Sequence, residues 1–314
     1  MKSLQKNLLF TPTIIEKIDS TSKNHIYIKR DDLIPFSFGG NKARKAMYFF
    51  DEILSGGYDT VVTYGSSSSN HCRVVANMAL KYGLGCYIVS PEEEYKETFN
   101  SILVKSFGAK TIKAPIDKIS ETIDALMEDL CKTCKPYFIQ GGGHGNIGTK
   151  AYVDAYEEIC DYEKANNIYF DYIFLASGTG TTQAGLVCGA ALNGHADRKI
   201  IGISIARQNP RGKEVVQQSV TDYLKSVDFK GKIPEVNFVD SYICGGYAKY
   251  NQEIKKCISE IISKNGIPLN ATYTGKAFWG MTEYIKKNSI TNKNILFIHT
   301  GGCPLFFDDL EVKK

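Results

Sequence analysis

Short apolar runs alternate with amphipathic stretches along almost the whole chain. Several runs are continuously apolar and are bounded by polar residues or glycine, which is the pattern of strands buried on both faces. We predict strands at 26–29, 60–64, 86–89, 137–139, 172–175, 200–204, 236–239 and 295–298.

The stretches between these strands repeat their apolar residues at the spacing of one helix face, as Val74, Val75, Met78 and Ala79 do. We predict helices at 44–54, 70–82, 119–130, 149–160, 182–192, 252–264 and 276–287. Alternation of strands and helices predicts an α/β protein whose parallel sheets are joined by right-handed crossovers. Ligands of such sheets bind beyond the carboxyl ends of the strands, so we expect a site in the loops that leave them.

Composition narrows the class of protein without naming a function. The 314 residues suggest about two domains at roughly 150 residues each, and the hydrophobic and charged contents of 43% and 23% are ordinary for a globular protein. A net charge of +4 without long basic runs gives no reason to expect a nucleic-acid partner. The chain has no apolar stretch of about 18 residues, so we expect no membrane partner.

The ends and the cysteines point to a reducing compartment. The first residues hold only Leu8-Leu9-Phe10 as an apolar run before Thr11-Pro12, so we expect no signal peptide and a cytoplasmic location. Nine scattered cysteines are typical of small buried apolar side chains in such a compartment. Cys131 and Cys134 have the spacing of a metal or redox pair, but no second pair is near, so we expect no metal site.

A glycine-rich loop at 177–182 joins a predicted strand to a predicted helix. Gly178 and Gly180 let the backbone approach an anion closely, and the following helix N-terminus together with Thr179, Thr181 and Thr182 would supply donors. The loop lacks both the Gly-Lys-Ser/Thr ending of a nucleotide P-loop and the spacing of a dinucleotide fingerprint. It therefore favours a phosphate site of another kind, and the alternative is a plain strand-to-helix turn capped by threonine.

Lys42 differs from the other lysines because Gly39 and Gly40 precede it and apolar Phe36 and Phe38 flank it. A desolvated lysine has a lowered pKa and can form a Schiff base. The alternative for Lys42, and for Lys45 three residues later, is a solvated surface charge.

The stretch 64–73 contains a run of four serines and also leads from a strand into a helix. Ser69 or Asn70 could be an ordinary helix N-cap, and His71 a packed or capping histidine. The chain has no Gly-x-Ser-x-Gly elbow, which argues against a hydrolase triad.

Taken together and in order, these segments resemble the pyridoxal-phosphate (PLP) enzymes of fold type II. The likeness is strongest to the branch of D-cysteine desulfhydrase and 1-aminocyclopropane-1-carboxylate (ACC) deaminase. The motifs that carry it are 28–33, Gly39-Gly40-Asn41-Lys42, Ser69-Asn70-His71, 177–186, Tyr273-Thr274-Gly275-Lys276 and 297–302.

The resemblance implies two parallel-sheet α/β domains, as in the β subunit of tryptophan synthase, with PLP in the cleft between them. The small domain would be residues 47–150, and the large PLP-binding domain would join 1–46 to 151–314. A homodimer is the family expectation.

The resemblance also implies roles for individual residues. Lys42 would carry PLP as a Schiff base, Asn70 would bind the 3-hydroxyl, and the loop 178–182 with Lys45 would hold the phosphate. Thr274 would meet the pyridine nitrogen. Lys42, or Ser69 on the other ring face, would take the Cα proton. Tyr273 would face the substrate as a third catalytic residue. The residues that bind the substrate would be Ser68, Ser69, His71, Tyr247, Tyr273 and Thr300.

Two departures from ACC deaminases guide the choice of reaction. Those enzymes carry Glu where this chain has Thr274 and Leu where it has Thr300. A glutamate favours a protonated ring and a strong electron sink, whereas a hydroxyl leaves the ring neutral, which suits elimination of a good leaving group. We therefore expect a PLP-dependent lyase that converts a small amino acid such as cysteine to pyruvate, ammonia and a thiol or sulfide.

Other activities remain open. ACC deaminase and cysteate sulfo-lyase are alternatives within the class, because the stretches 141–145 and 245–247 differ from either reference enzyme. A non-catalytic module that binds a phosphate ligand and a sugar-phosphate enzyme without PLP are the alternatives outside it.

Overall fold

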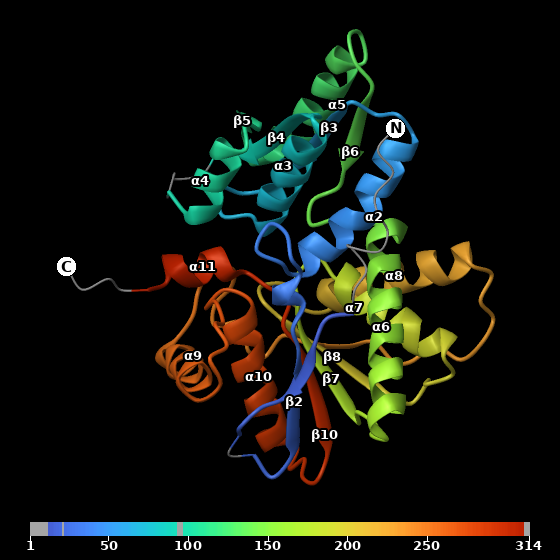
Figure 1. Ribbon diagram of the computed structural model, residues 1–314, viewed down its shortest axis with the longest axis vertical. Helices are drawn as coiled ribbons and strands as arrows, with labels where there is room; N and C mark the ends of the chain where they lie inside the picture. The colour runs from blue at the N-terminus through green and yellow to red at the C-terminus, as the bar shows by residue number, and fades with distance from the viewer. Residues whose placement is uncertain (1–11, 21, 93–96, 311–314) are drawn as a thin grey trace.

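The computed structural model describes residues 12–20, 22–92 and 97–310. In these ranges the chain forms two β-sheets, each with helices packed on both faces, and the smaller unit lies above the larger in Figure 1. The N-terminal segment in which we expect no signal peptide lies outside the described residues. Among the described residues, no helix combines the length and the apolar character that crossing a membrane would require.

The larger sheet has six strands in the order β1-β2-β10-β7-β8-β9. All neighbours are parallel except β1 and β2, in which Glu16 pairs with Ile28. The strands are β1 (Ile15–Lys17), β2 (His25–Lys29), β7 (Tyr172–Ser177), β8 (Lys199–Ser204), β9 (Asn237–Val239) and β10 (Asn294–Ile298).

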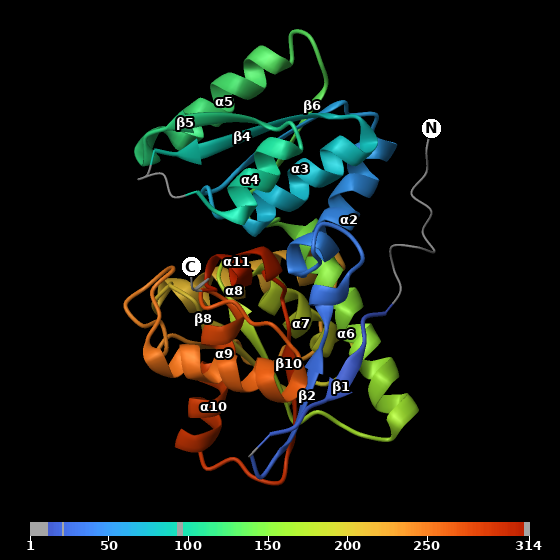
Figure 2. The ribbon, with the colours of Figure 1, turned by 60° about the vertical axis from the view of Figure 1, so that its left-hand side comes forward.

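Helices cover both faces of this sheet, which explains the continuously apolar strands. Ile173 and Leu175 of β7 point into a core shared with one set of helices, while Phe174 and Ala176 point into the core on the opposite face. The first set is α6 (Asn146–Asn166), α7 (Thr181–Leu192) and α8 (Arg211–Ser226), and the second is α9 (Gln252–Asn265) and α10 (Thr274–Lys287). Figure 2 shows α6 and α9 on opposite sides of the sheet.

The smaller sheet is parallel, with the order β5-β4-β3-β6. Its strands are β3 (Thr60–Tyr64), β4 (Gly85–Pro91), β5 (Lys110–Ala114) and β6 (Pro136–Ile139). The helices of this unit are α2 (Asn41–Ser55), α3 (Asn70–Tyr82), α4 (Phe99–Ser106) and α5 (Ile119–Leu130). Two single-turn helices, η1 (Asp31–Leu33) and η2 (Ile116–Lys118), and the short α11 (Cys303–Asp308) complete the described elements.

The predicted fold class is confirmed, since the structure has two α/β units built on parallel strands. The sequence reading missed β1, β5, α4, α8 and α11, and it began α2 three residues late, so that Lys42 lies in the first turn of the helix.

We propose that these units are the two domains, with the small domain at 47–150 and the remainder forming the large one. All strands of the smaller sheet come from residues 60–139 and all strands of the larger from outside that range, which supports the division. A boundary at 46–47 falls inside α2, whose Phe49 and Phe50 belong to the core of the smaller unit. The first turn of α2 therefore connects the two units.

Candidate active site

A cavity of about 310 Å³ lies where the carboxyl ends of β3, β7, β8 and β10 face one another, as expected for α/β sheets. It brings together eleven of the predicted site residues from both units. These are Lys42, Ser69, Asn70, His71, Gly178, Thr179, Gly180, Thr182, Tyr247, Tyr273 and Thr300. Four others, Lys45, Ser68, Thr181 and Thr274, lie outside its lining.

Lys42 enters the cavity from the first turn of α2, and a glycine makes this placement possible. Gly40 has φ +93°, and a Cβ there would lie 2.6 Å from the carbonyl oxygen of Thr300. The helix can therefore begin directly against the loop that follows β10. The Nζ of Lys42 donates a hydrogen bond to the carbonyl oxygen of Gly142 at 3.0 Å, and burial lowers the pKa of Lys42 to about 8. This amine is accordingly much easier to deprotonate than an ordinary lysine.

Asn70 lies at the start of α3 with its side chain fixed in one orientation. Its Oδ1 accepts hydrogen bonds from Nη1 of Arg73 at 2.7 Å and from Nδ2 of Asn100 at 3.0 Å. Because both partners are donors, they identify the oxygen end of the amide and leave its NH2 group for the cavity. Asn70 can therefore donate to an oxygen atom of a ligand.

Ser69 combines the two roles that the sequence left open. Its Oγ caps α3 by accepting from the backbone N–H of Cys72 at 3.2 Å, and the same residue lines the cavity. Accepting this bond leaves the hydroxyl proton of Ser69 free to donate.

His71 is held as a neutral imidazole. The hydroxyl of Thr63 donates to the carbonyl oxygen of Ile139 at 2.7 Å, so its oxygen must accept from Nε2–H of His71 at 2.9 Å. Burial first, and then the charges of Lys42 and Lys45, lower the pKa of His71 well below its usual range. His71 thus lines the cavity without adding charge.

The loop 178–180 leads into α7 and points the N-terminus of that helix at the cavity. The first N–H groups of a helix have no partner within the helix and carry a partial positive charge, which suits a phosphate. Thr182 is held in place because its Oγ1 accepts from Nδ2 of Asn41 at 3.0 Å. Thr181 is turned away, with its Oγ1 2.8 Å from Nδ1 of His144.

Two basic side chains near this loop have nitrogen atoms without a hydrogen-bond partner. The Nζ of Lys45 is buried and makes no hydrogen bond, and burial together with Lys42 lowers the pKa of Lys45 well below its usual range. Arg207 lines the cavity, and its Nη1 is likewise buried without a partner. Buried donors without acceptors are costly, so this region is suited to receive an anion.

Two tyrosines stand at the cavity with their hydroxyl oxygens 2.6 Å apart. Tyr273 precedes α10, whereas Tyr247 lies in the loop after β9. Burial first, and then Tyr247, raise the pKa of Tyr273 well above its usual range. Tyr273 is therefore a protonated hydroxyl at any physiological pH.

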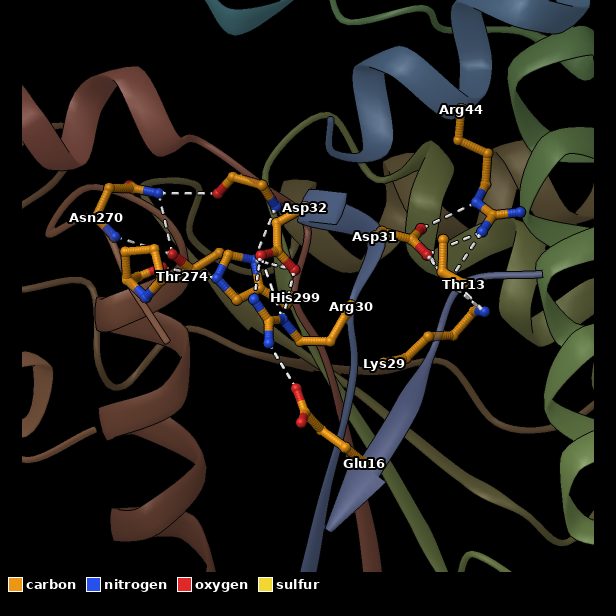
Figure 3. A network of polar contacts seen from close by, with 12 residues as sticks. Thr13, Glu16, Lys29, Arg30, Asp31, Asp32, Arg44, Asn270, Thr274 and His299 are labelled. Atoms are coloured by element: carbon orange, nitrogen blue, oxygen red, sulfur yellow. Dashed lines mark hydrogen bonds and ion pairs between the residues drawn. The ribbon is translucent and has the colours of Figure 1, made fainter. Parts of the chain in front are cut away.

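Thr274 and Thr300, the two threonines that distinguish this chain from ACC deaminases, lie at different depths from the cavity. Thr300 lines the cavity, whereas Thr274 is fully buried behind it. The Oγ1 of Thr274 accepts from the backbone N–H of Asn270 at 3.1 Å and from its Nδ2 at 3.0 Å, and Figure 3 shows the two side chains together.

A buried charge network anchors the start of α2 to the larger sheet (Figure 3). Asp31 accepts from Nη2 of Arg44 at 2.9 Å and from the hydroxyl of Tyr152, while Lys29 pairs with Glu158. Burial would raise the pKa of Asp31, but Arg44 and Lys29 outweigh it and hold that pKa well below its usual range. The network fixes the helix that carries Lys42.

Sequence reasoning missed several residues that line the cavity. Asn41 had a signal, since it lies inside the Gly-Gly-Asn-Lys motif. Arg207 had none, because it follows β8 in a loop without any motif. The others are Tyr64, Gly65, Ser66, Ala176, Ser177, Ile205, Ala206 and Gly301. Gly141 and Gly142 also line the cavity, and they belong to the stretch 141–145 that the sequence analysis singled out.

The residues present fit PLP. They supply an amine of lowered pKa in the cavity, an amide donor fixed toward it, and a helix N-terminus beside the partnerless donors of Lys45 and Arg207. These match the aldehyde, the phenolic oxygen and the phosphate of that molecule.

Comparison with known proteins gives the family. The family model described as "Pyridoxal-phosphate dependent enzyme" matches residues 7–301. A D-cysteine desulfhydrase of Yersinia pestis is 31% identical over 313 residues, covering 96% of this chain and 94% of that protein. A protein of Pyrococcus abyssi, named provisionally as a 1-aminocyclopropane-1-carboxylate deaminase, is 34% identical over 288 residues, covering 90% of this chain and 86% of that protein.

Solved structures agree. The crystal structure of an ACC deaminase homologue matches with a TM-score of 0.83 at 32% identity, covering 94% of this chain and 90% of that one. A hydrogen sulfide-producing enzyme from Fusobacterium nucleatum shares the fold, with a TM-score of 0.64 at 20% identity and 94% of each chain covered. The chain therefore belongs to the family of pyridoxal-phosphate dependent enzymes, and it is an enzyme of fold type II.

Proposed function

We propose that this enzyme is a lyase that eliminates the β-substituent of a small amino acid, with cysteine as the model substrate. One observation carries the proposal: among the described residues, none that lines the cavity bears a carboxylate. A ring nitrogen of PLP in this cavity would have no acid among the lining residues to keep it protonated. The electron sink that PLP supplies would then be weak, which suits a reaction whose leaving group departs promptly.

The residues of the chain divide into holding groups and reacting groups. Lys42 holds PLP, Asn70 donates to its phenolic oxygen, and the loop 178–182 with Lys45 receives its phosphate. Thr274 lies on the side proposed for the ring nitrogen. When bound, PLP supplies a conjugated system that accepts the electron pair left at Cα.

Lys42, or Ser69 on the other ring face, removes the Cα proton. A lysine with a pKa of about 8 is a suitable base near neutral pH, and positioned proton transfer contributes about 10²–10⁴-fold to a rate. The substrate carboxylate is proposed to bind the start of α3, where Ser69 has a free hydroxyl proton and where Ser68 and His71 lie nearby.

The leaving group is proposed to face the two tyrosines. The Cα–H and Cβ–S bonds break and the sulfur leaves as a thiolate, which can accept a hydrogen bond from the hydroxyl of Tyr273 because that hydroxyl keeps its proton. Water then hydrolyses the released aminoacrylate to pyruvate and ammonia. Thr300 lines the same cavity and contributes a further hydroxyl on the substrate side.

ACC deamination is the second candidate, because the Pyrococcus abyssi relative carries that name and an ACC deaminase homologue shares the fold at 32% identity. Kinetics with D-cysteine, L-cysteine, cysteate and ACC under identical conditions separate the candidates. We expect pyruvate and sulfide from cysteine, with the D-enantiomer preferred, and little 2-oxobutanoate from ACC. If ACC gives the highest kcat/KM, the reasoning from the missing carboxylate is wrong.

We also propose that the protein works in the cytoplasm as a homodimer. All nine cysteines are free thiols, which supports a reducing compartment, and the family resemblance supports the dimer. Light scattering of the purified enzyme tests the dimer directly.

A further inference from the structure

Lys276 is a buried lysine whose purpose the cavity lining does not explain. It lies in α10, three residues after Tyr273, and its side chain is inaccessible to solvent. Its Nζ donates to the carbonyl oxygens of Ile205 at 3.0 Å, Ile243 at 2.9 Å and Gly246 at 2.8 Å. An ammonium has three protons, so all its donors are used, and no carboxylate of the described chain pairs with it.

The three carbonyls belong to two segments that border the cavity. Ile205 follows β8 and lines the cavity itself. Ile243 and Gly246 belong to the loop between β9 and α9. Tyr247 of the same loop also lines the cavity. Lys276 therefore ties both segments to the helix that Tyr273 precedes, and all three meet around the substrate side.

The backbone of this loop is strained. Cys244 and Ala248 have φ of 52° and 56°, a left-handed conformation that is costly for residues with a Cβ, and Gly245 and Gly246 also have positive φ. Tyr247 is 41% exposed, so packing fixes it only in part. A strained conformation persists only where surrounding contacts enforce it, and the two bonds from Lys276 to the carbonyl oxygens of Ile243 and Gly246 are such contacts.

We propose that Lys276 is a positioning residue for substrate recognition: it holds the loop 243–247 so that the hydroxyl of Tyr247 meets that of Tyr273 at the cavity. This inference rests on the proposed function only for the identity of the substrate. The Tyr-Thr-Gly-Lys motif then has two roles: its tyrosine faces the cavity, and its lysine holds the loop that carries Tyr247.

A double-mutant cycle with Lys276→Met and Tyr247→Phe tests this proposal. Methionine keeps the length and the apolar stem but removes every donor. We expect Lys276→Met to raise KM for cysteine at least tenfold with a smaller change in kcat, and to leave the dissociation constant for PLP within about twofold. In the Tyr247→Phe background the same change should alter kcat/KM less than threefold, because the group that Lys276 positions is already gone. If the double variant loses kcat/KM by the product of the two single-variant losses, the residues act independently and the proposal is wrong.

Limited proteolysis gives a readout that needs no substrate. Lys249 and Tyr247 are exposed, but a protease also needs the chain around them to become extended, so trypsin and chymotrypsin should cleave Lys276→Met there at least tenfold faster than the wild type. Unchanged cleavage would refute the role of Lys276 even if the enzyme acts on an amino acid that we did not propose. Conversely, faster cleavage without turnover of any tested amino acid would count against the proposed function alone.

Arg198→Met is the matched control. Arg198 is another buried cation, but it pairs with Glu163 just before β8, at the end of the sheet away from the cavity. Its loss should lower the thermal stability without moving KM or the cleavage rate of the loop. If Lys276→Met does not fold, Lys276→Gln can replace it, because glutamine keeps two donors. Its KM should rise by a smaller factor than in Lys276→Met. A wild-type KM in Lys276→Gln would contradict the proposal.

Discussion

The lowered pKa of Lys42 predicts how fast the protein without cofactor should couple to PLP at each pH. Only the neutral amine attacks an aldehyde. At pH 7 an amine with a pKa of about 8 is about 9% neutral, whereas the amine of an ordinary lysine, with a pKa of 10.5, is about 0.03% neutral. The cavity therefore gives Lys42 an advantage of about 300-fold in reactive amine at neutral pH, before any effect of orientation.

The assay uses protein stripped of cofactor and mixed with PLP between pH 6 and 10. Because the pKa is lowered, the coupling rate should rise about tenfold per pH unit below 8 and level off above it. Borohydride reduction and peptide mapping should then locate the label on Lys42. Lys42→Arg is the control: it keeps a positive charge, leaves Lys45 in place and should take up no label.

Two outcomes would refute this reasoning. A rate that keeps rising through pH 10 would mean that burial does not lower the pKa of Lys42 as the cavity implies. A label on Lys45 would mean that the partnerless amine behind the cavity, rather than the one in it, is the reactive group.

Two further predictions concern the cap of α3 and the buried network. Ser69→Ala and Ser69→Gly both remove the hydroxyl, so both should lose kcat/KM equally while retaining PLP. Only Ser69→Ala should lower the unfolding free energy, by about 1 kcal/mol, because glycine is a tolerated N-cap. Wild-type kcat/KM in both variants would mean that Ser69 only caps the helix. Asp31→Asn should cost about 3–5 kcal/mol at pH 7, because it removes one partner of a buried charge network. The pKa of Asp31 is lowered by folding, so its contribution is present above its unfolded pKa of about 4 and is lost as the pH falls below that value. Urea unfolding from pH 7 to pH 2 should therefore show a steeper loss of stability for the wild type than for Asp31→Asn, and parallel curves would contradict the assignment.

The central strands were predictable because their environment is uniform. Each face of β7 meets a helix layer, so Tyr172–Ser177 must be apolar throughout most of its length and is recognisable without any alignment. The two missed strands, which lie at one edge of each sheet, lack this signal. β5 carries Lys110 and Lys113 on exposed positions, and β1 has only three residues, so neither shows an apolar run. The helix α8 did carry a signal, since Val216, Val220, Tyr223 and Leu224 recur at helical spacing.

The start of α2 was misplaced for a different physical reason. Helix N-termini are usually marked by a capping side chain, but Gly40 occupies that position and makes no side-chain bond. The start is set instead by contacts with a distant segment, since the N–H of Asn41 donates to the carbonyl oxygen of Thr300 at 3.0 Å. Such contacts join segments that are far apart in the sequence, so no pattern of neighbouring residues predicts them. The same holds for the contacts that Arg207 and Lys276 make.

The hydrogen bonds of Thr274 bear directly on the choice between the two candidate reactions. A hydroxyl has two lone pairs and one proton, and Asn270 occupies both lone pairs with its N–H and its amide. Asn270 is itself held by donation to the carbonyl oxygen of Gly301 at 3.1 Å, so it cannot turn its oxygen toward Thr274 without losing that bond. The remaining function of Thr274 is to donate. If the ring nitrogen of PLP lies against this hydroxyl, as proposed, it would accept a hydrogen bond and would therefore be neutral. The sequence suggested a neutral ring only because a threonine replaced a glutamate. In that arrangement the contacts of Asn270 would supply the physical reason, and a neutral ring would favour elimination of sulfur over opening a carbon–carbon bond.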